Sequence, residues 1–187
     1  MSIAPSLRER QAPLKARYEA DPASATLTIT VRSTTDGNDP TRSRISSGAG
    51  GGVDWEIGAH PYAGGEGDLA CSGDLLLASL AACQEITLRM VAAAMGITLD
   101  AVELTVQGDM DFRGTMGVDP ETPVGFQTIR TAVKISANVP ADRLERLFQR
   151  AERYCVVNAT LRNSPIMETS FSSAPATQSS NTEGAQQ

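Results

Sequence analysis

The stretch SGDLLLASLAACQEITLRMVAAAMG, residues 72–96, decides the fold of this chain. After its second position it contains no Gly or Pro until its end, so it predicts one long helix with Ser72 as N-cap and Gly96 as a left-handed C-cap. Almost every position as far as Ala82 is apolar or small, which predicts a helix buried on most of its faces. The longest strongly apolar run ends at Cys83, well short of the roughly 20 residues of a membrane helix, so no membrane span is predicted.

Segments with the two-residue period of β-strands lie on both sides of this helix. Before it, residues 24–33 alternate apolar and polar side chains and predict a half-buried strand, followed by strands near 42–46 and within 53–58. After it, strands are predicted over 101–113 and 126–137, the latter with Ile129, Ala132 or Val133, and Ile135 facing inward.

The C-terminal part of the chain predicts a second helix and a last strand. The helix begins near Pro140, ends near Tyr154 and buries one face; the residues of that face are Leu144, Leu147, Phe148 and Ala151. Residues 165–171 predict the last strand. Strands and helices in this order indicate an α+β fold.

The domain organisation follows from length and composition. The 187 residues suit one domain, which we place at 24–171. Residues 1–23 form a charged N-terminal arm with at most a short helix, and 172–187 form a disordered tail of Ser, Ala, Gln, Asn and Thr.

Charge and residue counts exclude several classes of protein. The net charge of −6 argues against a nucleic-acid surface. The single histidine, His60, excludes a multi-His metal site and disfavours a Ser–His–Asp triad. Three cysteines are too few for a secreted disulfide scaffold, and the N-terminus lacks the apolar core of a signal peptide, so we expect a cytoplasmic protein. A zinc site of His60 and the cysteines lacks the close C-x₂-C pair that such sites favour.

Each cysteine has two interpretations. Cys83 is either a small buried side chain or a nucleophile, and the dipole of its own helix fades too early to activate it, so a nearby cation such as arginine is required. Cys155, at the end of the second helix, is either a half-buried core residue or a resolving thiol, because the dipole there disfavours a thiolate. Cys71 is either an incidental loop thiol or a further resolving or regulatory thiol.

Two segments together resemble the OsmC/Ohr family of thiol-dependent peroxidases. They are GDLLLASLAAC (73–83) and ERLFQRAERYCVVNATLRNSPIMETSF (145–171), and the resemblance covers about residues 24–171. It implies curved antiparallel sheets wrapped around two long central helices in an intertwined homodimer, with active sites at the dimer interface. It also implies organic hydroperoxides as substrates, a dithiol reductant, and no cofactor or metal.

The same resemblance implies roles for individual residues. Cys83 would be the peroxidatic cysteine and Cys155 the resolving cysteine. The activating arginine of the family comes from the N-terminal hairpin, where Arg42 and Arg44 are the candidates, with Arg32 behind them; a family glutamate that orients it matches Gly73, which leaves Asp74 as the nearest carboxylate. Cys155 is also followed by Val156 where the family often has proline.

Two functions are therefore weighed. The first is a peroxidase that reduces organic hydroperoxides through Cys83 and Cys155. The second is a non-catalytic protein of the same fold that binds a small apolar ligand or acts as a redox-sensitive module, and Gly73 in place of the glutamate motivates it.

Overall fold

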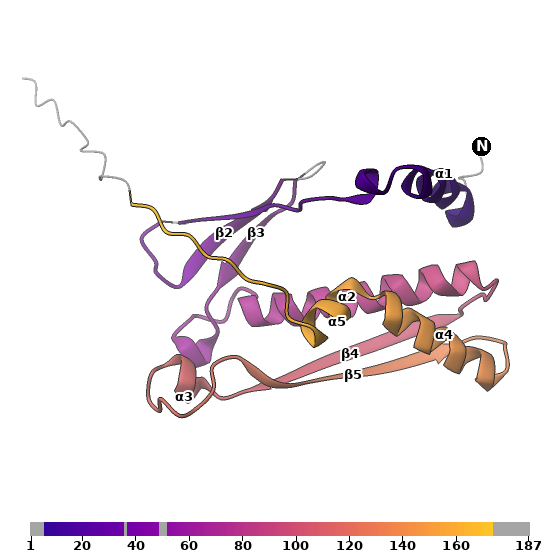
Figure 1. Ribbon diagram of the computed structural model, residues 1–187. Helices are drawn as coiled ribbons and strands as arrows, with labels where there is room; N and C mark the ends of the chain where they lie inside the picture. Colours follow the sequence, from indigo (N-terminus) through magenta and orange to yellow (C-terminus); the bar gives the residue numbers. More distant parts are fainter. Residues whose placement is uncertain (1–5, 36, 49–51, 174–187) are drawn as a thin grey trace, which may run out of the picture.

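The fold is α+β, as the sequence predicts. The structure is a computed structural model and describes residues 6–35, 37–48 and 52–173. A long antiparallel ribbon, β4–β5, carries helices α2 and α4 on one face. A three-stranded sheet lies near the N-terminal half of α2, on the side of this helix that faces away from the ribbon (Figure 1). Helix α1 (Leu7–Ala20) lies near the other end of α2, where the two helices make contact.

Helix α2 spans Ser72–Ala94 and confirms the long helix predicted from the sequence. It ends before Gly96, which takes the predicted left-handed conformation with φ of 65°. The prediction of Ser72 as N-cap is wrong, because the preceding residue, Cys71, accepts the capping hydrogen bond.

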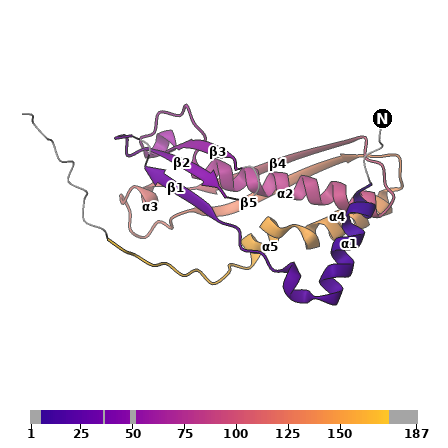
Figure 2. The same cartoon turned by 90° about the horizontal axis from the view of Figure 1, so that it is seen from above.

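Both sheets are antiparallel, and Figure 2 shows β1–β3 near the start of α2 and β4–β5 running along that helix. Strand β2 (Arg42–Ser47) lies between β1 (Val31–Thr35) and β3 (Asp54–Gly58). Strand β4 (Ala101–Met110) pairs along its whole length with β5 (Phe126–Ser136), and its residues alternate between exposed and half-buried. The alternation gives the ribbon one face for the helices and one for water.

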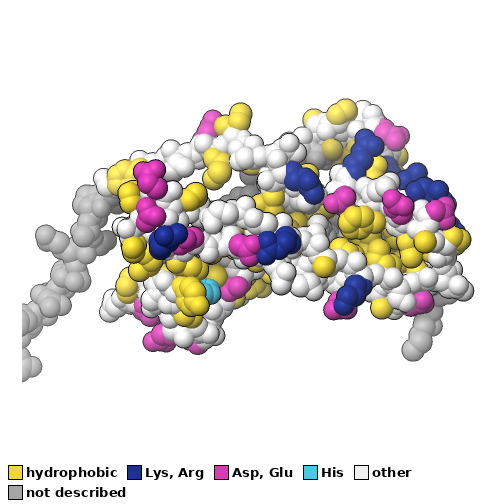
Figure 3. All heavy atoms as spheres, turned by 90° about the horizontal axis from the view of Figure 1, so that it is seen from below, with side chains coloured by type: hydrophobic (Ala, Val, Ile, Leu, Met, Phe, Trp, Pro, Cys, Tyr) yellow, Lys and Arg dark blue, Asp and Glu magenta, His cyan; other side chains and the backbone are white. Residues whose placement is uncertain are grey.

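The water-facing side of the ribbon is ionic. Seen from below, side chains of opposite charge lie next to one another (Figure 3). Cross-strand ion pairs join Arg130 to Asp109 and Lys134 to Glu103. Such pairs add little stability, but they keep this face in water and so direct the other face toward the helices.

The core lies between α2, α4 (Ala141–Tyr154) and the ribbon. Leu88 and Ala92 of α2 pack with Leu147 and Ala151 of α4, and Leu147 is fully buried. Val133 and Ile135 of β5 pack against this cluster, which confirms Val133 rather than Ala132 as the inward-facing residue. The predicted apolar face of the second helix is therefore the contact between the two long helices.

Helix α2 is less buried in the single chain than predicted. The ribbon and α4 cover one side only, so Leu76, Ile86 and Met90 are 38%, 55% and 37% exposed. By length and composition α2 is also the one described helix that could cross a membrane, but a core helix of a soluble protein passes the same test. One face of the helix packs against α4 and the ribbon, while 22% of its most apolar 18-residue window is buried in the single chain.

The N-terminal third differs from the predictions in two places. The predicted half-buried strand over 24–33 is wrong, since the strand begins only at Val31 and is exposed throughout; its ladder ends there because β2 ends opposite it at Ser47. The arm forms a 14-residue helix rather than at most a short one. Ser6 and Glu9 form a capping box at the start of this helix, and their spacing is a sequence pattern that indicates a helix start.

The C-terminal part also differs. Residues 156–162, which the sequence left unassigned, form α5 (Val156–Arg162). The predicted strand over 165–171 is extended but unpaired, with Ile166 92% and Phe171 91% exposed, because no strand of the described chain runs beside it. Most of the predicted disordered tail, 174–187, lies outside the described residues.

Candidate active site

Cys83 and Cys155 meet where three helices come together. Cys83 is half-buried in the middle of α2, and Cys155 is only 1% exposed. Cys155 is at once the C-cap of α4 and the N-cap of α5, so the chain turns from one helix into the next at this residue. Because α2 packs against both α4 and α5, the turn brings the two thiols close enough for each to shift the pKa of the other.

The surroundings of Cys83 favour its thiolate. Partial burial raises the pKa of Cys83, but hydrogen bonds from the backbone N–H of Val157, the Cys155 thiol, the Thr87 hydroxyl and the N–H of Val156 outweigh burial, so the net pKa is lowered. The sequence predicted that a cation lowers the pKa of Cys83. In the single chain, neutral hydrogen-bond donors lower it instead, and two of them lie in the first turn of α5.

The surroundings of Cys155 favour its protonated thiol. Burial is the main cause of a raised Cys155 pKa; the Asn158 N–H opposes it, and the neighbouring Cys83 thiol raises the pKa further. The two neighbouring thiols therefore differ in ionisation: Cys83 loses its proton more readily than an ordinary thiol, and Cys155 keeps its proton more readily.

The three arginines predicted as candidates for activating Cys83 all lie on the N-terminal sheet. Arg42 Nη2 lies 2.7 Å from Glu66 Oε2 and 2.8 Å from Asp68 Oδ2, and these carboxylates raise the pKa of Arg42. Arg44 Nη2 lies 3.0 Å from Glu56 Oε1, and Arg32 is exposed on β1. None of the leading contributions to the Cys83 pKa comes from an arginine.

Asp74 lies in the first turn of α2, about two and a half turns before Cys83. Its carboxylate accepts the Cys71 N–H at 2.9 Å, and its own N–H donates to Cys71 Sγ at 3.4 Å. The hydrogen bond from the Cys71 backbone is the main cause of a lowered Asp74 pKa. In the single chain, therefore, both Asp74 and Cys71 serve the start of the helix.

Gly73 departs from the family's glutamate for a reason of space. A Cβ at this position would lie 3.3 Å from the ring of Phe126 and 3.4 Å from Cys71 Sγ, which is tight for both neighbours. The glycine lets the start of α2 rest against the beginning of β5. A larger side chain here would require the ring of Phe126 to shift by a few tenths of an ångström.

The hydrogen-bond donors around Cys83 were not predicted from the sequence. Thr87 stands four residues after Cys83 and therefore on the same helix face, so its spacing was a readable signal. The N–H groups of α5 had no such signal, because α5 itself was not predicted. Arg162 of α5 was also missed; its Nη2 lies 3.7 Å from Glu152 Oε1 of α4 and links the two helices beside Cys155.

His60 has a local role in the loop before α2. Its Nδ1 accepts the Tyr62 N–H at 3.1 Å, and its ring stacks on Phe112. Within the described residues, no three His, Cys, Asp or Glu side chains gather as metal ligands do.

The site consists of a half-buried thiol, Cys83, beside a buried thiol, Cys155, and their pKa values are shifted in opposite directions. Together with the α+β fold and its two packed helices, this site is typical of a two-cysteine thiol protein. The sequence model of the family described as OsmC-like protein matches residues 65–170. This span is more than half of the chain and includes both cysteines, so the protein belongs to the OsmC-like family.

Solved structures agree with this assignment at the level of the fold. An OsmC-like protein from Mycoplasma pneumoniae superposes with a TM-score of 0.59 at 19% identity, over 74% of this chain and 89% of that chain. An organic hydroperoxide resistance protein from Elizabethkingia anophelis gives 0.55 at 20%, over 74% and 91%. One from Legionella pneumophila, named OsmC and a predicted redox protein, gives 0.54 at 20%, over 73% and 90%. No curated protein sequence matches the chain.

Proposed function

We propose that this protein is a thiol-dependent peroxidase that reduces organic hydroperoxides, with Cys83 as the peroxidatic and Cys155 as the resolving cysteine. The observation that carries the proposal is the turn between α4 and α5, which places the Cys155 thiol beside Cys83 of α2; the pKa of Cys83 is lowered there and that of Cys155 is raised. The names of similar structures as hydroperoxide resistance proteins support the substrate class.

The reaction has three balanced steps. The Cys83 thiolate attacks the outer oxygen of R–O–OH, the O–O bond breaks, and the alkoxide takes a proton, which leaves Cys83–SOH and the alcohol ROH. The Cys155 sulfur then attacks the sulfenic sulfur; an S–S bond forms, and the hydroxyl leaves as water with the Cys155 proton. A dithiol reductant finally returns both thiols and is itself oxidised to a disulfide.

The geometry suits the second step in particular. A resolving thiol must reach the sulfenic sulfur without large movement of the backbone, and Cys155 already lies close enough to Cys83 to shift its pKa. Its thiol is buried, so water and external oxidants reach Cys83 first. Arg42, Arg44 and Asp74 remain predicted participants, and in the single chain each has another partner.

The test is consumption of cumene hydroperoxide with a dithiol reductant. We expect the wild type to consume it and Cys83→Ser to lose the activity, while Cys71→Ser, a matched change at a thiol outside the pair, retains it. A wild-type rate no greater than that of Cys83→Ser contradicts the proposal and favours the non-catalytic alternative. That alternative draws on Arg42, which lies among carboxylates rather than beside Cys83.

We also propose that the protein is a homodimer in the cytoplasm. The exposed apolar face of α2 and the unpaired segment with Ile166 and Phe171 are surfaces that a second copy can cover. Light scattering after size exclusion should give twice the mass of the 187-residue chain. Ile166→Asp should then lower that mass toward a monomer, whereas Val118→Asp, also at an exposed apolar residue, should not.

A further inference from the structure

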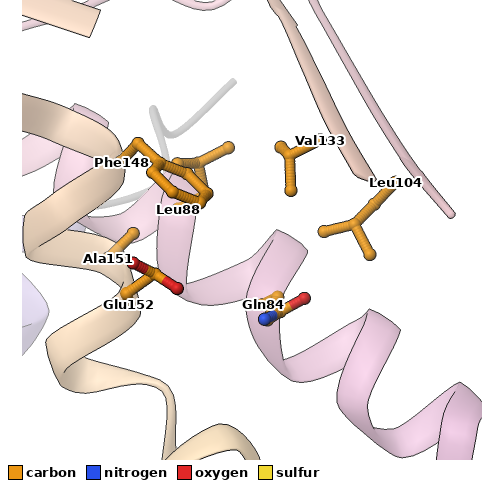
Figure 4. Close-up of a pocket in the computed structure, with 7 residues that line it drawn as sticks. All are labelled: Gln84, Leu88, Leu104, Val133, Phe148, Ala151 and Glu152. Carbon is orange, nitrogen blue, oxygen red and sulfur yellow. The ribbon is translucent and has the colours of Figure 1, made fainter. Parts of the chain in front are cut away.

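The cavity between α2, α4 and the β4–β5 ribbon is too small for an organic ligand (Figure 4). The space in it that is open to the centre of a water molecule is about 10 Å³, which is room for one water. A water there can donate a hydrogen bond to the side-chain oxygen of Gln84, which has no partner among the described residues. Any larger ligand must therefore bind elsewhere.

A much larger pocket opens at the start of α2, where this helix meets the end of β4 and the beginning of β5. It measures about 460 Å³, which is an ordinary size for small-molecule sites, since these span roughly 300–1,000 Å³. Gly73 and Leu77, one turn apart on α2, lie on one side of it, and Gly108 of β4 lies on another. Neither Cys83 nor Cys155 is among the described residues that line it, so this pocket is separate from the cysteine pair.

Aromatic rings gather around this pocket. Only 4% of the chain is Phe, Trp or Tyr, yet three such rings and the single histidine line it; they are Phe112, Phe126, Tyr62 and His60. His60 caps the short helix η2 (Pro61–Ala63), which contains Tyr62, and Phe112 begins α3 (Phe112–Thr115). The His60 ring stacks on Phe112 with their centres 5.0 Å apart, and the Tyr62 ring meets both at a steep angle, at 5.2 and 5.5 Å.

The fourth ring, Phe126, depends on a glycine in the neighbouring strand. A Cβ at Gly108 would lie 2.6 Å from the Phe126 ring, so the ring can lie across β4 only because this position has no side chain. Aromatic side chains bind a further ring by stacking and an organic cation through the negative faces of their rings. The lining of this pocket therefore suits an aromatic or cationic organic molecule.

The charge of the lining favours a cation. The Asp74 carboxylate lines the pocket, and while its Oδ2 accepts the Cys71 N–H at 2.9 Å, its Oδ1 accepts no hydrogen bond from the described residues. The second carboxylate of the lining, Asp109, is paired with Arg130, and no Lys or Arg is among the described lining residues. The N-terminus of α2 carries about half a positive charge, which reduces but does not cancel the full charge of Asp74.

We propose that this pocket binds a small aromatic amine, whose ring packs against the aromatic side chains while its ammonium group pairs with the Asp74 carboxylate. The rings supply affinity for the body of the ligand, and the carboxylate supplies the preference for a positive charge. Tyr62 is 74% exposed, so it stands at the mouth of the pocket, where a ligand enters. This binding site is independent of the proposed peroxidase function.

The experiment compares phenethylamine with phenylacetate, which has the same ring and the opposite charge. Binding to the reduced full-length protein is measured by calorimetry, and phenylacetate should bind at least about tenfold more weakly than phenethylamine. Asp74→Asn should weaken phenethylamine at least about fivefold, whereas Asp142→Asn, at a first-turn carboxylate of α4, should leave its affinity unchanged. Tyr62→Ala should also weaken it, and Tyr18→Ala, at an exposed ring of α1, should not.

A second measurement needs only the wild type and locates the ligand. His60 is the only histidine of the chain, so its ring has NMR signals of its own, and phenethylamine should shift them. Absence of binding at millimolar phenethylamine overturns the proposal, as does equal affinity for phenylacetate. Unchanged affinity in Asp74→Asn, or binding that leaves the His60 signals in place, overturns it too. Because binding is measured without peroxide, a failure of the peroxidase proposal would leave this result unaffected.

Discussion

Cys71 and Cys83 both belong to the region of helix α2, but their surroundings differ. Cys71 caps the N-terminus of α2, where the sequence is rich in glycine and the thiol shares a capping box with Asp74. Cys83 lies three turns further on, in the most apolar part of the helix, and contacts the thiol of Cys155. From its own helix alone, Cys71 has the more favourable position for a thiolate, because the helix dipole acts there and not at Cys83.

The comparison teaches that a second helix decides which thiol is poised for chemistry. Cys83 gains its donors from the first turn of α5 and from Cys155, which α4 places against α2. Cys71 faces a loop and the side of Phe126, and its sulfur accepts a hydrogen bond that serves the helix. The predictions below test this difference.

The largest effect should come from Cys155→Ser. Multiple turnovers with a dithiol should fall by roughly tenfold or more, because the resolving thiol loses its high effective concentration next to Cys83. One equivalent of hydroperoxide should still be consumed, and dimedone followed by mass spectrometry should trap the sulfenic acid on Cys83. Trapping on Cys71 instead would reverse the assignment of the two thiols.

The next effect concerns the packing that holds the pair. Leu147 is fully buried between α4 and α2, so Leu147→Ala should lower the free energy of unfolding by about 2–5 kcal/mol. Urea denaturation measures it. Val118→Ala, at a residue 71% exposed, is the control and should change stability little. A small loss at Leu147 would mean that the α2–α4 contact does not hold the cysteines in place.

A smaller effect should follow from Asp74→Ala at the capping box. Loss of a carboxylate from the first turn of a helix costs about 0.3–1 kcal/mol. The Asp74 pKa is lowered, so its stabilisation is present above the ordinary carboxyl pKa and is lost as pH falls through the lowered value. Thermal unfolding at neutral and acid pH should show this. If Asp74→Ala instead abolished peroxidase activity in a folded protein, the family's role for this carboxylate would apply.

The smallest effect should come from Thr87→Val, which removes one of several donors to Cys83. The pKa of Cys83 should rise, so alkylation by iodoacetamide should need a higher pH in the variant than in the wild type. In the wild type, ionised Cys83 stabilises the fold above the ordinary thiol pKa, and this is lost as pH falls through the lowered pKa. The alkylation profile of Cys71 should be the same in both proteins.

Periodicity predicted the elements that form the core. The run over 72–96 gave α2, and the spacing of Leu147 and Ala151 gave the face of α4 that packs on it, because burial is written directly into the pattern of apolar side chains. Pairing was harder to predict. Residues 24–30 and 165–171 have strand-like patterns, yet in the single chain no neighbouring strand receives them.

The sequence predicted which two cysteines form the candidate site, but not the groups that surround their sulfur atoms. The resemblance singled out Cys83 and Cys155, which in the structure are neighbours that shift one another's pKa; their catalytic roles stay predictions. The donors around Cys83 are backbone N–H groups, which every residue carries, so no side-chain motif announces them. Gln84 likewise looked like an interruption of an apolar run, and only burial makes its unpartnered oxygen notable.

The turn at Cys155 also limits how the length of this chain can vary. Helices α4 and α5 share this single residue as cap, with no spacer between them. One inserted residue at this extended junction would displace α5 relative to α4 and carry its first N–H groups away from Cys83. Substitutions here change the strength of individual contacts, whereas an insertion or deletion removes the whole set of donors at once. The junction should therefore accept new side chains more readily than any change in residue count.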